Sequence, residues 1–130
     1  MVGVVVVAHG RLGEALVEAL ASVVGPVEHI VAVSSVPGEA PEGLRDRIHA
    51  AVRGVDQGEG VLILTDMKGD TQTNQSLAVA RASGAEVVAG VNMPMLVKLA
   101  SGCEGMAVRE LAPFIQRYGQ EHIVWVPASR

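Results

Sequence analysis

The residue best placed for chemistry is His9, which directly follows the apolar run 2–8 and precedes a helical pattern of apolar residues. In a parallel α/β sheet, ligands gather at the carboxyl ends of the strands, and His9 stands at such an end. Gly10 places no side chain beside the imidazole, and Arg11 adds a cation. The free N–H groups at the start of the next helix favour a bound anion. A phosphoryl group held on His9 would therefore meet peptide donors, a helix dipole and the Arg11 guanidinium.

The other three histidines are expected to have structural roles. His29 and His122 stand at the starts of expected strands, and His49 lies in the middle of a helical pattern. None of these positions is the carboxyl end of a strand, where this kind of sheet places its ligands.

Asp66 is the candidate partner of His9. An imidazole that acts as a nucleophile through one nitrogen needs its other nitrogen to keep a proton and to face an acceptor. Asp66 stands at the end of the third expected strand, after the apolar run 61–64. If the first and third strands are neighbours, Asp66 and His9 lie at the same edge of the sheet. Asp66 then either orients His9 or caps the turn that follows it.

The polar segment after Asp66 supplies further candidates. Gly69 permits a positive φ or a close approach of the backbone, and Thr71 offers a hydroxyl group or a helix N-cap. Asp70 is a second carboxylate, and it would repel a phosphoryl group on His9. We therefore expect the Asp70 side chain to point away from the histidine.

The elements that must position these residues alternate along the chain. Apolar β-branched runs predict strands, and apolar residues at helical spacing predict helices between them. The strands are expected over 2–8, 29–33, 61–64 and 86–91, and the helices over 12–23, 44–55, 77–83 and from Asn92-Met93-Pro94 onward. Such alternation with short connections predicts a parallel sheet with helices on both faces. We expect one domain over residues 1–130, with three αβα layers and four parallel strands.

The C-terminal part departs from this alternation. A helix is expected from about Met106 to Tyr118, with Pro113 inside it and Gly119 as a hinge after it. The run His122 to Val126 then predicts a last strand, in which Ile, Val, Trp and Val follow one another with no polar residue between them. Such a strand at an open edge is an aggregation hazard, so we expect it to be covered.

The composition excludes several classes of protein. Only 2% of the residues are aromatic against 49% hydrophobic ones, so the core must be aliphatic. The net charge of -4 and the absence of a Lys/Arg stripe argue against a nucleic-acid partner. Cys103 is the single cysteine and cannot form an internal disulfide, and no apolar run reaches the length of a membrane span. These features predict a cytoplasmic protein.

Four segments of the sequence resemble the mannose-type enzyme IIA family of the bacterial sugar phosphotransferase system. They occur in the family's order and cover nearly the whole chain: Val5-Val6-Val7-Ala8-His9-Gly10, Val36-Pro37-Gly38-Glu39, Leu62-Ile63-Leu64-Thr65-Asp66 and Gly90-Val91-Asn92-Met93-Pro94-Met95-Leu96. The resemblance implies that His9 is the phosphorylated histidine and that Asp66 is its partner. Beside these two, the positions and side chains of Gly10, Arg11, Gly69 and Thr71 make them the candidate phosphate-binding residues.

One loop departs from the family pattern. After the aspartate the family typically reads Gly-Gly-Ser-Pro, with an aromatic residue and then Asn, whereas this chain has Met67-Lys68-Gly69-Asp70-Thr71-Gln72-Thr73-Asn74. The first glycine, a hydroxyl residue and the asparagine remain, and the second glycine, the proline and the aromatic residue are absent. This loop helps to form the surface offered to partners, so the departure concerns the identity of the partner and the choice between sugar uptake and regulation.

The resemblance further implies a phosphotransferase whose donor and acceptor are both proteins. The phosphoryl group would arrive from a phosphorylated histidine carrier protein and leave for a IIB protein, with a membrane IIC/IID transporter as a further contact. No cofactor and no metal are expected. Family members are typically homodimers in which a C-terminal strand crosses to the partner's sheet, antiparallel to it, and His122 to Val126 is placed to do this.

Three alternatives share parts of this pattern. Small tetrapyrrole metal chelatases resemble the strand followed by His-Gly, but they need more acidic or histidine groups than Asp66 alone. The phosphocarrier subunit of dihydroxyacetone kinase systems resembles the first half of the chain, but the segment Asn92 to Leu96 fits the mannose type better. A binding module that holds a nucleotide or phosphate without transfer lacks its motif, since no GxGxxG or GxxxxGK[ST] occurs.

Overall fold

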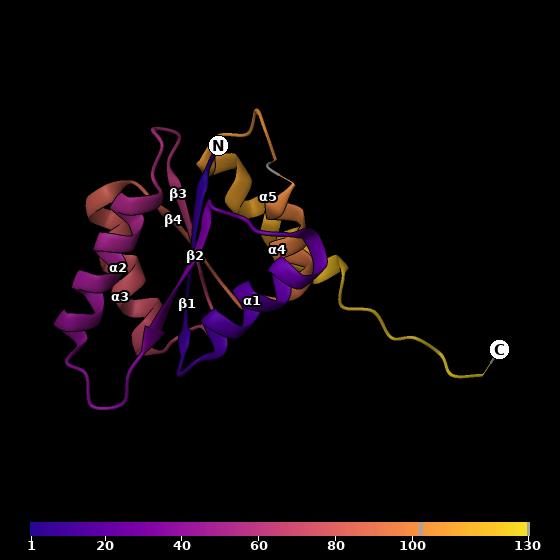
Figure 1. Cartoon of the computed structure of the whole chain (residues 1–130), viewed down its shortest axis with the longest axis horizontal. Coiled ribbons are helices and arrows are strands. Elements are labelled where there is room, and N and C mark those ends of the chain that lie inside the picture. The colour runs from indigo at the N-terminus through magenta and orange to yellow at the C-terminus, as the bar shows by residue number, and fades with distance from the viewer. Residues whose placement is uncertain (102, 130) are drawn as a thin grey trace.

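The computed structural model describes residues 1–101 and 103–129, which fold into a three-layer α/β structure (Figure 1). Four strands and five helices occur in the described residues. They are β1 (Gly3–His9), α1 (Leu12–Val24), β2 (Ile30–Ser35), α2 (Pro41–Val55), β3 (Val61–Thr65), α3 (Thr71–Ser83), β4 (Glu86–Ala89), α4 (Met93–Ala100) and α5 (Val108–Glu121). The predicted alternation of strands and helices is confirmed.

The sheet places β1 and β3 side by side. Its strand order is β2-β1-β3-β4, and all neighbouring pairs are parallel. Val7 of β1 is level with Thr65 of β3, and His9 is level with Ser35 of β2. The residues that follow β1 and β3 therefore emerge at the same end of the sheet, as the sequence predicted for His9 and Asp66.

Helices cover both faces of the sheet, and the alternation of side chains along β1 serves both layers (Figure 1). Val4 and Val6 pack in one cluster with residues of α1, α4 and α5. Val5 and Val7 pack in a second cluster with residues of α2 and α3. Both faces of β1 are thus buried, which explains why its sequence is a continuous apolar run rather than an alternating one. Among the described residues, no helix has the length and apolar character needed to cross a membrane.

Gly119 is not the hinge expected from the sequence. The helix α5 continues through it to Glu121, and Gly119 is buried. A Cβ at this position would lie 2.6 Å from Sδ of Met95, and the Gly119 carbonyl accepts a hydrogen bond from Nδ2 of Asn92 at 3.0 Å. The missing side chain therefore allows close packing of α5 on the start of α4, and it does not end the helix.

The C-terminal segment extends away from the body of the protein (Figure 1). Residues 122–126 form no strand in the single chain, because they lie outside the four-stranded sheet and have no strand to pair with there. The side chains of this segment are largely in solvent, with exposed fractions of 77% for Ile123 and 86% for Trp125. The predicted strand would require an edge supplied by another subunit, and its exchange between subunits stays a prediction.

Candidate functional site

His9 and Asp66 meet at the carboxyl ends of β1 and β3. Nδ1 of His9 lies 2.7 Å from Oδ2 of Asp66, and the backbone N–H of His9 donates a hydrogen bond to the same oxygen at 3.0 Å. One carboxylate oxygen therefore holds both the ring and the main chain of the histidine. The Asp66 side chain is 9% exposed and that of His9 is 45% exposed, so a largely buried carboxylate orients an accessible imidazole.

This pairing changes the acid–base behaviour of both groups. The hydrogen bond that the His9 ring donates to Asp66 is the largest of several influences that raise the pKa of His9 above its usual value, with smaller contributions from the charges of Asp66 and Asp70. Burial acts to raise the pKa of Asp66, but the hydrogen bonds and charge of His9 together lower it below the usual value. Asp66 therefore stays ionised and favours a proton on Nδ1.

Asp70 also contacts His9, so the expectation that its side chain points away is wrong. Oδ2 of Asp70 lies 2.8 Å from Nε2 of His9. Its other oxygen, Oδ1, accepts a hydrogen bond from the N–H of Thr71 at 2.7 Å and caps α3. The expectation considered only repulsion from a phosphoryl group. In the unphosphorylated protein the carboxylate is attracted instead by the imidazole and by the helix N-terminus.

The glycine and arginine that follow His9 form the turn into α1. Gly10 adopts a φ of 52°, and its N–H donates to the carbonyl of Ser35 at 3.2 Å. The guanidinium of Arg11 is 81% exposed and lies 3.4 Å from the carboxylate of Glu14. Gly10 is therefore beside His9 as expected, whereas Arg11 is directed toward α1 in the unphosphorylated protein.

The two other predicted phosphate-binding residues lie in the β3–α3 connection. Gly69 adopts a φ of 80°, and nothing lies within 4 Å of the place where its Cβ would be. The N–H of Thr71 is occupied by Asp70. Among the described residues singled out from the sequence, Asp66 and Asp70 are the ones whose side chains contact the His9 ring.

A buried pair of hydroxyl groups fixes the connection that carries both carboxylates. Thr65, the last residue of β3, and Thr73, in the first turn of α3, have their Oγ1 atoms 2.7 Å apart. The Thr73 hydroxyl also donates to the carbonyl of Met67. The sequence reasoning missed this pair and the role of Asp70. Asp is a common N-cap, but the helix expected over 77–83 begins six residues later than α3, so its start was not placed next to Asp70.

The β2–α2 loop borders the same end of the sheet (Figure 1). Glu39 accepts hydrogen bonds from Nε of Arg47 at 2.8 Å and from Nη2 at 2.6 Å. Arg47 also donates to the carbonyl of Ser34, near the end of β2. The pair therefore ties this loop to the strand beside β1, and the Arg47 hydrogen bonds hold the pKa of Glu39 below its usual value.

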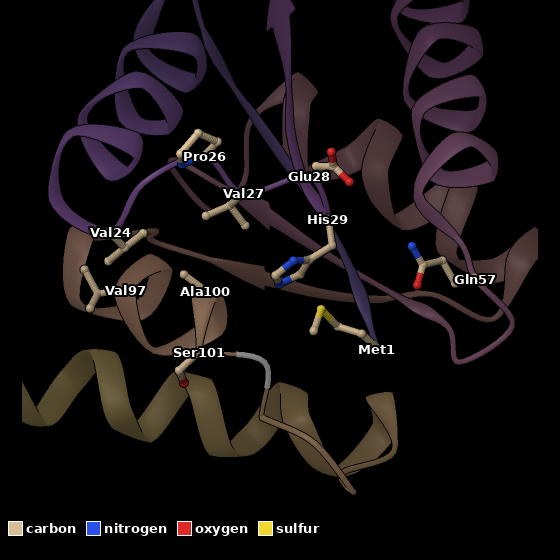
Figure 2. Close-up of a pocket in the computed structure, with 10 residues that line it drawn as sticks. All are labelled: Met1, Val24, Pro26, Val27, Glu28, His29, Gln57, Val97, Ala100 and Ser101. Carbon is tan, nitrogen blue, oxygen red and sulfur yellow. The ribbon is translucent and has the colours of Figure 1, made fainter.

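A cavity of about 740 Å³ lies at the opposite end of the sheet, near the amino ends of β1 and β2. Figure 2 shows the His29 ring pointing into it, between Ala100 and Met1. Nε2 of His29 lies 3.0 Å from the carbonyl oxygen of Leu99, so its hydrogen-bonding capacity is used within the fold. The cavity wall is mainly apolar and carries no counterpart of the paired carboxylates around His9.

The fold and the His9 site together define a class: a parallel α/β domain with a carboxylate-bound, accessible histidine at the carboxyl ends of its central strands. The family model described as the phosphotransferase system (PTS) fructose IIA component, EIIA-man, matches residues 3–116. The chain therefore belongs to the mannose-type EIIA family of the sugar phosphotransferase system. The resemblance seen in the sequence is confirmed, and the family is a phosphocarrier component of that system rather than a chelatase.

The most informative relatives come from different sugar systems. The chain is 28% identical to the PTS system fructose-specific EIIA component of Bacillus subtilis over 122 residues, and this region covers 93% of this chain and 84% of the relative. It is 35% identical to the PTS system mannose-specific EIIAB component of Escherichia coli K12 over 98 residues, and this region covers 75% of this chain and 30% of that relative. This chain thus corresponds to less than a third of the longer EIIAB protein.

A solved structure supports the fold. The mannose/sorbose-specific IIA subunit from Enterococcus faecalis superposes with a TM-score of 0.88, at 23% identity, over 99% of this chain and 97% of that chain. The predicted three-layer fold with four parallel strands is confirmed by this likeness.

Proposed function

We propose that this protein carries a phosphoryl group on Nε2 of His9, which it accepts from a phosphorylated histidine carrier protein and passes to a histidine of a IIB protein. The observation that supports this proposal is the contact between Nδ1 of His9 and the carboxylate of Asp66. With the Nδ1 proton held by Asp66, the neutral ring presents the lone pair of Nε2.

The chemistry required of the site is modest. Transfer between two imidazoles forms a nitrogen–phosphorus bond at His9 and breaks the corresponding bond of the donor. Such transfer depends mainly on positioning and on charge stabilisation, and no covalent help from another residue is needed. Asp66 would stabilise the positive charge that builds up on the ring during attack. Asp66 and His9 are the catalytic residues of this proposal.

The phosphoryl oxygens would be received by the turn after β1 and by the N-terminus of α3. Gly10 leaves room beside the ring, and Gly69 and Thr71 flank the helix start. The exposed side chain of Arg11 can reach an anion if it leaves Glu14. These four residues are proposed as phosphate-binding groups, and no cofactor or metal takes part in the scheme.

The proposed partners and assembly follow the family. Protein donors and acceptors would approach the exposed face of His9 in the cytoplasm, and a IIC/IID transporter would lie further downstream if the protein serves uptake. The changed loop 67–74 supports a partner that differs from the usual IIB proteins, and a regulatory output is part of the proposal. The exposed segment Ile123 to Val126 supports a homodimer in which each subunit adds this strand to the other's sheet.

Phosphorylation in vitro tests the site. The protein would be incubated with phosphoenolpyruvate, enzyme I and the histidine carrier protein, and the label mapped under alkaline conditions that preserve phosphohistidine. We expect label on His9 alone and none in His9→Ala. His49→Ala, on α2, is the matched control and should be labelled like the native chain. Label on another histidine, or undiminished label in His9→Ala, overturns the proposal.

A further inference from the structure

The imidazole of His9 lies between two carboxylates, one on each ring nitrogen. Asp66 is 2.7 Å from Nδ1 and Asp70 is 2.8 Å from Nε2. Two acceptors at these distances favour the imidazolium, which carries a proton on each nitrogen. That form has no free lone pair and cannot attack phosphorus. The unphosphorylated site is therefore held in a state that must change before a phosphoryl group is accepted.

Asp70 also occupies the region in which the phosphoryl group must bind. A phosphorus bonded to Nε2 lies closer to that nitrogen than the 2.8 Å contact made by Oδ2 of Asp70, and its oxygens carry negative charge. The second oxygen of Asp70 takes the N–H of Thr71, which is a natural donor for a phosphoryl oxygen at the start of α3. The carboxylate and the phosphoryl group thus compete for one nitrogen and for one helix N-terminus.

We propose that Asp70 is a third functional residue of this site: its carboxylate occupies the phosphoryl position on Nε2 of His9 in the unphosphorylated protein and is displaced when the phosphoryl group arrives. This inference rests on the proposed function of His9. It assigns Asp70 a role that the family pattern does not contain, since Asp70 stands where the family has its second glycine.

The structure allows such a displacement. Asp70 is 33% exposed, and it follows Gly69, which has a φ of 80° and open space around it. The ends of the connection are held by Thr65 and Thr73, so rotation of the Asp70 side chain leaves β3 and α3 in place. After displacement the N–H of Thr71 is free for a phosphoryl oxygen.

Phosphorylation of His9 moves a proton off Nε2 and a phosphoryl group onto it. The Nε2 proton of the imidazolium passes to solvent as Asp70 leaves, and the lone pair of Nε2 forms the bond to phosphorus. The nitrogen–phosphorus bond of the donor breaks, and the donor nitrogen that is released takes a proton from solvent. Asp70 regains its place on Nε2 only when the phosphoryl group has been passed on.

The effect of Asp70 on the pKa of His9 depends on the other charged groups that face the ring. From the β3–α3 connection these are Asp66 and Asp70, and both raise the pKa of His9. From the turn into α1 the nearest charged side chain is Arg11, which lies beside Glu14. Glu14 also accepts a hydrogen bond from the Ser34 hydroxyl on β2. Removal of the Asp70 charge should therefore lower the pKa of His9 and make the neutral ring available at lower pH.

Asp70→Asn tests this inference, because an asparagine caps a helix as well as an aspartate does and so leaves α3 intact. Asp46→Asn, an exposed position on α2, is the matched control for the loss of one negative charge. Two quantities would be measured in each chain: the pKa of His9 by NMR titration of the unphosphorylated protein, and the rate of labelling from the phosphorylated carrier protein across the pH range.

We expect Asp70→Asn to lower the pKa of His9 and to speed labelling severalfold at pH values below the native pKa, because more of the rings are then neutral. The gain should vanish at high pH, and Asp46→Asn should behave like the native chain. Asp70→Gly, which restores the family's residue, should show the same gain. An unchanged pKa and labelling rate overturns the inference, and so does slower labelling at every pH, which would make Asp70 a proton acceptor that assists transfer.

The two proposals fail in different ways. If His9 is labelled and Asp70→Asn is indistinguishable from the native chain, the inference about Asp70 is overturned and the proposed function stands. If His9 is labelled in neither chain, the proposed function is overturned, and the inference that rests on it is overturned as well.

Discussion

Replacement of Asp66 by asparagine separates the charge of this residue from its hydrogen bonds. In the native site, Oδ2 of Asp66 accepts both the Nδ1 proton of His9 and the backbone N–H of the same residue. An asparagine that turned its NH₂ group toward His9 would face the backbone N–H with another donor. The amide oxygen therefore takes the place of Oδ2, and the ring keeps its proton on Nδ1.

The size of the expected rate loss follows from the weaker hydrogen bond that a neutral amide accepts. A hydrogen bond to a charged group contributes about 1.5–3 kcal/mol against about 0.5–1.5 kcal/mol for a neutral one, so the loss is about 1–1.5 kcal/mol. If the whole loss is added to the activation free energy of phosphoryl transfer, transfer slows roughly tenfold. The NH₂ group falls at the place of Oδ1, a buried atom without a hydrogen-bond partner among the described residues. The unfolding free energy should therefore drop by about 1–3 kcal/mol.

The assay is single-turnover labelling of His9 by the phosphorylated carrier protein, with urea unfolding of the same samples. NMR titration should also show a lower pKa for His9, because the raised value depends first on Asp66. Asp56→Asn is the matched control, since Asp56 caps a turn through the N–H of Gly58 but does not touch His9. It should leave labelling unchanged.

The result of the Asp66→Asn experiment is decisive in either direction. Where an asparagine imposes the wrong tautomer on a catalytic histidine, the rate falls about 10⁴-fold. A loss of that size here would refute the argument that the backbone N–H of His9 fixes the amide. An unchanged rate would return Asp66 to the role of a turn cap.

Two further predictions concern the fold and the assembly. Truncation after His122 removes the segment with Ile123 to Val126 but keeps α5 whole, so we expect the intact chain to sediment as a dimer and the truncated chain as a monomer or an aggregate. An intact chain that sediments as a monomer would contradict the dimer. A truncated chain that remains a dimer would contradict strand exchange. Gly119→Ala places a Cβ 2.6 Å from Sδ of Met95, so thermal or urea unfolding should show a loss of about 1–3 kcal/mol, whereas Gly54→Ala, at an open position on α2, should be nearly neutral or slightly stabilising.

Much of the fold could be predicted from the sequence because the strands are sharply marked. The β-branched runs around Val4 and Leu62 have few polar residues, and the glycines and prolines between elements mark their ends. The strand boundaries depend on pairing as well as on local sequence: the second strand, expected over 29–33, spans Ile30–Ser35. Its last residues are serines, which carry no apolar signal, and pairing with β1 extends the strand through them.

The site was predicted in part for an equally physical reason. His9 is the last residue of β1 and Asp66 directly follows β3, and parallel neighbours bring such positions together, so position in the sequence was sufficient to predict their contact. The direction of the Asp70 side chain depends on whether His9 carries a phosphoryl group, and the sequence gives no information about that state. Gly119 looked like a helix end, but its role depends on a contact with Met95, which is distant along the chain.

The buried hydroxyl pair of Thr65 and Thr73 has a consequence for how this protein can diversify. It anchors both ends of the β3–α3 connection inside the protein, while Met67 and Lys68 between them are exposed. These two residues can therefore be exchanged without shifting the end of β3, which Asp66 directly follows. If the loop selects the acceptor of the proposed carrier, a library varied at Met67 and Lys68 would change the acceptor while His9 and Asp66 keep their geometry.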